Sequence, residues 1–188
     1  QDVRLYNNIA DTYKKKALET GEVQSVQTGI DWLQTAIQNR SQINHFTTYQ
    51  HYVYKDVGEL YTLRGELELH HESLEDAQTS FELAMRYLRA AVRLAEQSED
   101  VDKNNVIARS YYYEGLVSYR LLQGTLPSNG RELENQELTT EQQELQTQAL
   151  EFFESALEYK PNFPEAEAAL QVVDPQAQQE MQEQLRET

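Results

Sequence analysis

The residues that most often carry catalysis or bind metals are sparse in this chain of 188 residues. The four histidines are His45, His51, His70 and His71, and no two of them are four residues apart, as a helical metal-binding pair requires. Adjacent helical residues point about 100° apart, so His70 and His71 cannot face one ion together. We therefore expect solvated or hydrogen-bonded histidines and no metal site.

Other catalytic patterns are also missing from the sequence. No cysteine is present, which excludes disulfides, thiolate metal ligands and a cysteine nucleophile. Neither a serine nucleophile elbow nor a glycine-rich phosphate loop occurs. Carboxylates are so abundant that any pair of them is uninformative. We assign no catalytic residue and no cofactor, and we expect a protein that is not an enzyme; stoichiometric binding of a metal or nucleotide would contradict this.

Tyrosine is the residue type whose distribution favours recognition. The 12 tyrosines gather mainly in segments 49–61 and 111–119. Tyrosine offers a large contact area at low entropic cost together with a hydroxyl group, which suits peptide capture, although it also packs well inside helical cores. The candidate partner-binding tyrosines are Tyr54, Tyr61, Tyr112, Tyr113 and Tyr119.

Arginines form a second candidate surface. Arg86, Arg89 and Arg93 follow the i, i+3, i+7 spacing of one helical face, and Arg109 lies on the next predicted helix. Such a stripe can bind an acidic partner segment, or its members can pair within the helix, as Glu82 with Arg86 at i, i+4. We take Arg86, Arg89 and Arg109 as candidate partner-binding residues. The Lys14–Lys16 run is interpreted as a solvated helix end.

Charge and hydropathy narrow the partner class to proteins. The chain has 16 basic and 32 acidic side chains, so nucleic acids and anionic membrane surfaces would repel it. The most apolar stretch, 83–95, contains three arginines, and we expect no membrane insertion by this segment. Residues 131–188 hold 3 basic and 14 acidic side chains. This acidic part could cap a helical array or dock a basic partner.

The apolar spacing is helical throughout, and no proline occurs before position 127. Gly21 suits a helix C-cap, Ser73 with Asp76 resembles a capping box, Thr140 with Gln143 suggests another N-cap, and Pro164 fits a first turn. A bend at Gly58 would divide the third helix, and residues 124–139 are predicted to form a loop. The helices are expected at about 2–19, 24–40, 43–71, 73–97, 102–123, 140–160, 164–173 and 175–186.

A short motif with offsets of four and three residues occurs three times. Its copies are Ala77–Phe81–Ala84, Ala149–Phe153–Ala156 and Gly29–Leu33–Ala36. A small residue precedes each copy on the preceding helix, namely Gly65, Gly115 and Ala10. Small residues let two antiparallel helices approach closely, and the large residue between them fills the gap to the next pair of helices.

This pattern resembles the tetratricopeptide repeat (TPR) family. Residues 149–162 (ALEFFESALEYKPN) match the second half of the family's 34-residue pattern, and the resemblance covers most of residues 5–173. The third repeat carries about 22 extra residues and the first about seven. Arg89 stands where the pattern has proline, so longer hairpins and an irregular superhelix are expected.

The resemblance implies an all-α fold in which antiparallel helical hairpins stack as a TPR-like right-handed superhelix, an α-solenoid. A single domain would cover residues 1–188. Its hairpins would span about 2–40, 43–97 and 102–160, with capping helices at about 164–173 and 175–186.

The resemblance also implies a non-catalytic interaction module whose concave groove binds a peptide or helix of a partner protein. Adaptors and complex-assembly factors are of this kind, and the composition is compatible with a photosynthetic-complex assembly factor. Arg4 and Asn8 mimic only part of the clamp with which some family members hold a partner's C-terminal carboxylate, so chaperone-tail binding is disfavoured. The alternative function is a self-associating structural or regulatory region of a larger protein, which would form a homo-oligomer.

The chain begins at Gln1 rather than methionine. We therefore expect a processed chain or a piece of a longer protein. A bacterial cytoplasmic protein and the soluble part of a membrane-anchored protein both remain open.

Overall fold

The computed structural model describes residues 2–125 and 138–173, and these residues form seven α-helices and one 3-10 helix. Within these ranges there is no strand, only an isolated backbone bridge between Asp2 and Asn44. The fold is therefore all-α, as expected. The expected helix at 175–186 and most of the expected loop at 124–139 lie outside the described residues. The α-helices are α1 (Val3–Thr20), α2 (Val23–Gln38), α3 (Phe46–His70), α4 (Leu74–Glu96), α5 (Lys103–Thr125), α6 (Thr140–Tyr159) and α7 (Pro164–Val173), and the 3-10 helix is Arg40–Gln42.

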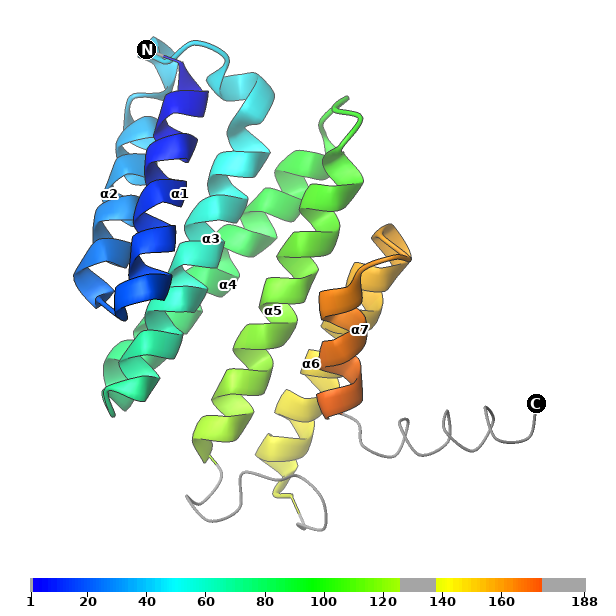
Figure 1. Cartoon of the computed structure of the whole chain (residues 1–188). Coiled ribbons are helices and arrows are strands. Elements are labelled where there is room, and N and C mark those ends of the chain that lie inside the picture. Colours follow the sequence, from blue (N-terminus) through cyan, green and yellow to red (C-terminus); the bar gives the residue numbers. More distant parts are fainter. Residues whose placement is uncertain (1, 126–137, 174–188) are drawn as a thin grey trace.

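The helices pair in chain order and then line up in two rows. Figure 1 shows α1, α3 and α5 side by side, with α2, α4 and α6 behind them and α7 beside α5. Each helix packs against the next one along the chain, and α3 also contacts both α1 and α5. Among the described residues the even-numbered helices make almost no contact with one another. The odd-numbered helices therefore form a continuous wall.

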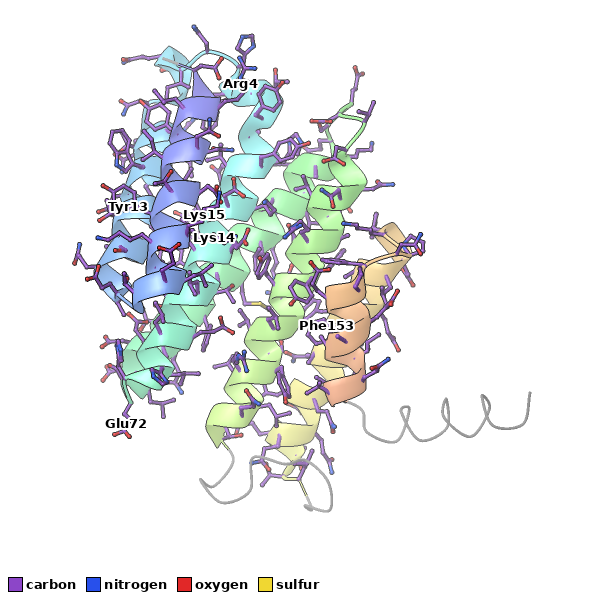
Figure 2. The ribbon with its side chains drawn as sticks, viewed as in Figure 1. Arg4, Tyr13, Lys14, Lys15, Glu72 and Phe153 are labelled. Atoms are coloured by element: carbon purple, nitrogen blue, oxygen red, sulfur yellow. The ribbon has the colours of Figure 1, made fainter. Side chains whose placement is uncertain are left out.

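Two glycines allow close helix pairing in the second and third hairpins. A Cβ atom at Gly65 of α3 would lie 2.5 Å from the ring of Phe81 on α4. A Cβ atom at Gly115 of α5 would lie 2.6 Å from the ring of Phe153 on α6, which Figure 2 labels. Each phenylalanine thus fills the space that a larger side chain would need, as in close ridge-into-groove packing.

The first hairpin reverses this arrangement. Gly29 lies on the second helix of the pair, and a Cβ atom there would be 3.3 Å from the backbone oxygen of Ala10 on α1. Ala10 itself is buried. The small residues therefore face each other from both helices, and Leu60 of α3 closes the gap from the next hairpin.

Most expected helix ends lie within three residues of the observed ones. Gly21 caps α1 as predicted: its φ of +70° is in the left-handed region that glycine adopts without strain, and its N–H donates to the Ala17 carbonyl. The third helix begins at Phe46, later than expected, because Arg40–Gln42 form the 3-10 turn and Asn44 pairs with the start of α1. It continues through Gly58 without interruption.

Two predicted caps were wrong in detail. Ser73 does precede α4, but its hydroxyl lies 2.5 Å from the Asp76 carboxylate and caps no backbone N–H, so the capping box is not formed. The N-cap of α6 is Thr139, not Thr140, and its capping-box partner is Gln142. Thr139 accepts from the Gln142 N–H, and Gln142 accepts from the Thr139 N–H.

The buried core fixes the relative positions of the helices. Its largest cluster joins α1 to α4 and includes Leu33, Leu60, Phe81 and Leu88, all fully buried. Smaller clusters around Phe153 and Phe163 join α5 to α6 and α7. Burying a side chain of this size contributes about 1.5–3 kcal/mol, so each helix of the wall is anchored from behind.

Candidate functional site

Helices α1, α3 and α5 enclose a hollow of about 360 Å³, which we call the inner hollow. Figure 2 shows Lys14 on the side of α1 next to α3, where the hollow lies. The face that these helices share is strongly polar. The lining residues are Asn7, Asn8, Ala10, Asp11 and Lys14 of α1, Lys55, Asp56, Glu59 and Leu60 of α3, and Asn105 and Arg109 of α5.

Helical periodicity explains why these residues share one surface. Asn7, Asp11 and Lys14 are spaced by four and three residues, and Asn105 and Arg109 by four, so each set forms a stripe along its helix. The faces next to these stripes, about 100° around each helix, carry buried side chains such as Tyr6 and Val106. Burial of the apolar faces therefore turns the polar stripes toward one another.

Glu59 is the centre of the hollow's charge network. Its carboxylate is 5% exposed and accepts from Lys14 of α1 and from the hydroxyl of Tyr113 on α5. Lys55 Nζ lies 3.7 Å from the second oxygen. Burial acts to raise the pKa of Glu59, but Lys55, Lys14 and Tyr113 outweigh it and hold the pKa below its ordinary value. The network thus joins three helices through one ionised group.

The other carboxylates of the hollow also have basic partners. Asp56 Oδ1 lies 2.5 Å from Lys55 Nζ, and Asp11 Oδ2 lies 2.6 Å from Lys15 Nζ. Since these charges are already paired, they are poorly placed to attract a further cation.

Three side chains that line the inner hollow have hydrogen-bonding groups that are not fully used within the described residues. Asn8 is exposed, and its amide makes no hydrogen bond within the described residues. The Asn7 Oδ1 atom is buried and has no partner in the described part of the chain. Arg109 bonds to Tyr113 but has no carboxylate within ion-pair distance among residues 2–125 and 138–173. An amide pair and a guanidinium can bind peptide groups and a carboxylate.

The predicted tyrosines of α3 lie away from the inner hollow. Tyr61 is 5% exposed, stacks on Tyr87 of α4 at 5.7 Å between ring centroids, and accepts a 3.0 Å hydrogen bond from Gln34 Nε2 of α2. Tyr54 also contacts Tyr87, at 5.9 Å. Both tyrosines join neighbouring helices.

The predicted tyrosines of α5 divide between two surroundings. The Tyr112 ring lies 5.8 Å from Phe153 and 5.2 Å from Phe163, and Tyr119 packs against the cluster that contains Phe153. Tyr113 alone among these five tyrosines bonds to a residue that lines the inner hollow. Arg109 lines it directly.

Sequence reasoning missed most of the inner hollow. Lys14 was interpreted as part of a solvated helix end, yet its side chain is 28% exposed and pairs with Glu59, 45 residues away. Asn7, Lys55 and Asn105 were not singled out. Arg4, half of the considered clamp, binds Asp2 through two hydrogen bonds of 3.0 and 2.8 Å at the start of α1. Figure 2 shows Arg4 at the far end of α1 from Lys14.

The arginine stripe of α4 does not line the inner hollow and borders a different concave surface. Arg86 is exposed, and the expected pair with Glu82 is not among the ion pairs of the described residues. Arg89 instead reaches across to α5, where its Nε lies 3.2 Å from Glu114 Oε2. Glu114 is 1% exposed, and burial raises its pKa to about 7 against the opposing effect of Arg89.

The histidines do not form a group. His51 is 1% exposed, and its Nε2 lies 3.4 Å from Asp100 Oδ2; burial lowers the pKa of His51 despite this carboxylate. His70 and His71 have ring centroids 5.9 Å apart. Within residues 2–125 and 138–173, no three His, Asp or Glu side chains are arranged to hold a metal ion. In the same ranges no helix is both long enough and apolar enough to span a membrane.

Comparison of the chain with protein-family models, with curated proteins and with solved structures gave no match.

Proposed function

We propose that this chain is a TPR-like, non-catalytic interaction module that binds a peptide or helix of a partner protein in the inner hollow. The inner hollow would be the concave groove of a short α-solenoid. The module would serve as an adaptor or a complex-assembly factor, and assembly of photosynthetic complexes is one role of this kind.

The repeated helix pairing supports the TPR-like part of this proposal. Gly65 meets Phe81, and Gly115 meets Phe153, at closely similar distances. In both hairpins the phenylalanine is the central residue of the repeated Ala–Phe–Ala motif. A repeat array requires the same contacts between equivalent positions of the repeated motif.

The binding part of the proposal is supported by which groups of the inner hollow are already paired and which are not. The acidic groups of the inner hollow already have partners, while Asn8, the Asn7 oxygen and the Arg109 guanidinium have capacity left. Amide groups can donate to and accept from a peptide backbone, and a guanidinium binds a carboxylate with two hydrogen bonds. A peptide with an acidic side chain or a free C-terminus fits this set.

The alternative function, self-association, is favoured by apolar exposure on the first hairpin. Leu18 is 61% exposed, Leu5 51% and Trp32 39%. Exposed apolar groups join two copies of a chain where they form one contiguous patch, so the mass of the chain in solution decides whether these side chains act in this way. Light scattering that gave a dimer mass independent of concentration would favour this alternative.

Affinity capture from the source organism tests the proposal. The immobilised chain is compared with Asn8→Ala/Arg109→Ala and with Arg40→Ala, which removes an exposed arginine that does not line the inner hollow. Captured proteins are identified by mass spectrometry, and a synthetic segment of the partner is then titrated by calorimetry. We expect the double variant to weaken binding at least about tenfold while Arg40→Ala has no effect. Equal affinity of all three proteins would exclude the inner hollow as the binding site.

A further inference from the structure

A second concave surface lies on the other side of α5, and we call it the outer groove. Its floor is formed by Phe81 and Met85 of α4 and Leu121 of α5, and its volume is about 450 Å³. Figure 1 shows α4 behind the space between α3 and α5, with α6 on the other side of α5. Among the described residues, α4 and α6 make almost no contact with each other.

The outer groove continues into an apolar hollow of about 160 Å³. The two share Phe81 and Leu121. The apolar part adds Leu74, which is 49% exposed, Ala77 and Leu145 of α6. The surface therefore has an apolar end toward the start of α4 and a charged end further along α4.

The charged end is cationic. Arg86, Arg89 and Arg93 line it, and among the described lining residues Glu82 alone is acidic. Arg89 is engaged by Glu114, but within the described residues neither Arg86 nor Arg93 has a carboxylate within ion-pair distance. In a chain of net charge −16, two unpaired arginines next to an apolar floor are a local reversal of charge.

We propose that the outer groove docks an acidic amphipathic helix of a partner protein. Apolar residues of that helix lie on Met85 and Leu121, which are only partly buried, and its carboxylates pair with Arg86 and Arg93. This surface is separate from the inner hollow and can be occupied at the same time.

The spacing of the arginines determines the form of the partner. Arg86 and Arg93 are seven residues apart on a helix, which corresponds to about 10 Å along its axis. A partner helix with carboxylates at i and i+7 presents charges at the same spacing. The described residues contain no strand whose edge could pair with an extended peptide. A helix lying in a groove between helices is the recognition mode that matches the spacing of Arg86 and Arg93.

A designed peptide tests the docking. The probe is a fluorescein-labelled 18-residue helix with leucines along one face and glutamates at i and i+7 beside it. Its controls are a scrambled peptide of equal composition and a peptide with lysine in place of glutamate. Fluorescence anisotropy is measured with the full chain, with Arg86→Glu/Arg93→Glu and with Arg40→Glu as the matched control. Circular dichroism and urea unfolding establish that each variant is folded.

We expect the acidic peptide to bind the wild type, and to bind the double variant at least about tenfold more weakly. Arg40→Glu should leave the affinity unchanged, and the lysine peptide should prefer the double variant. Affinity should fall with added salt, because the pairs are exposed. The proposal is overturned if the acidic peptide does not bind at about 1 mM, if the scrambled peptide binds equally well, or if the double variant keeps full affinity.

Discussion

Glu59 in the inner hollow and Glu114 beneath the outer groove are both buried glutamates on the wall of odd-numbered helices, yet they differ in charge. Three donors from two neighbouring helices and its own helix surround Glu59, and its pKa is lowered. One exposed arginine reaches Glu114, whose Oε1 has no partner among the described residues and whose pKa is raised to about 7. The number of donors, rather than burial, decides whether a buried carboxylate stays ionised.

The two glutamates therefore affect stability in opposite pH ranges. A carboxylate whose pKa is lowered on folding contributes stability above its ordinary pKa of 4.5, and this is lost as the pH falls through the folded value. A carboxylate whose pKa is raised contributes stability below 4.5, and this is lost as the pH rises from 4.5 to about 7. The contribution of Glu59 to the stability of the fold is thus lost in acid, whereas that of Glu114 is lost at neutral and alkaline pH.

The largest expected effect comes from Glu59→Gln. Removing this charge leaves Lys14 without a carboxylate partner among the described residues and Lys55 with Asp56 alone, and breaking a buried pair costs about 3 kcal/mol or more. Urea unfolding at pH 7 measures the loss, with Glu19→Gln on the exposed side of α1 as the control. A loss similar to the control would mean that the Glu59 network does not hold the three helices together.

The same substitution at Glu114 is expected to change the free energy of unfolding in the opposite direction. We expect Glu114→Gln to be stabilising at pH 8 and close to neutral at pH 5, because the wild type must ionise a buried carboxyl between these values. A pKa raised from 4.5 to about 7 corresponds to about 3 kcal/mol over the full transition. Urea unfolding of both proteins from pH 5 to pH 8 measures the difference. Parallel profiles would refute the raised pKa.

Tyr113→Phe tests whether the number of hydrogen-bond donors around Glu59 keeps its carboxylate ionised. It removes one hydrogen bond to an ionised group and is expected to cost about 1.5–3 kcal/mol. It also moves the pKa of Glu59 upward, so the acid unfolding midpoint rises. Tyr112→Phe is the matched control, since the Tyr112 ring packs against Phe153 and Phe163 and its hydroxyl has no hydrogen bond within the described residues. Equal behaviour of the two variants would remove Tyr113 from the network.

The smallest effect is expected from Arg89→Gln. Arg89 is 57% exposed, so its pair with Glu114 contributes less than about 1 kcal/mol. The loss should appear at pH 8 and vanish at pH 5, where Glu114 is protonated. Unfolding at the two pH values in low and high salt checks both statements. A larger loss at pH 5 would indicate that Arg89 acts through packing instead of charge.

The helices were predictable because their signals are local. Apolar spacing, Gly21 and Pro164 fix the positions of most elements within the described residues. The cap of α6 shows where local signals end: Thr139 and Thr140 are each followed three residues later by a glutamine, so the sequence offers two equivalent capping boxes. Only the packed helix selects Thr139.

The candidate site was less predictable because its contacts are not local. Glu59 is 45 residues from Lys14 and 54 from Tyr113, and α3 is buried on several faces, so no single stripe identifies its buried glutamate. Glu114 did leave a signal. It follows the buried Ser110 by four residues and precedes the buried Val117 by three, so a carboxyl group falls on an apolar stripe. That irregularity in periodicity could have identified it.

The uneven contacts between the two rows of helices have a mechanical consequence. Successive hairpins are joined through α3 and α5, each of which contacts both helices of the hairpin before it, while the even-numbered helices make almost no contact with one another within the described residues. Displacing one hairpin from the next therefore separates α3 or α5 from two helices at once, whereas a change in the spacing of the even-numbered helices alone breaks almost no contact between them.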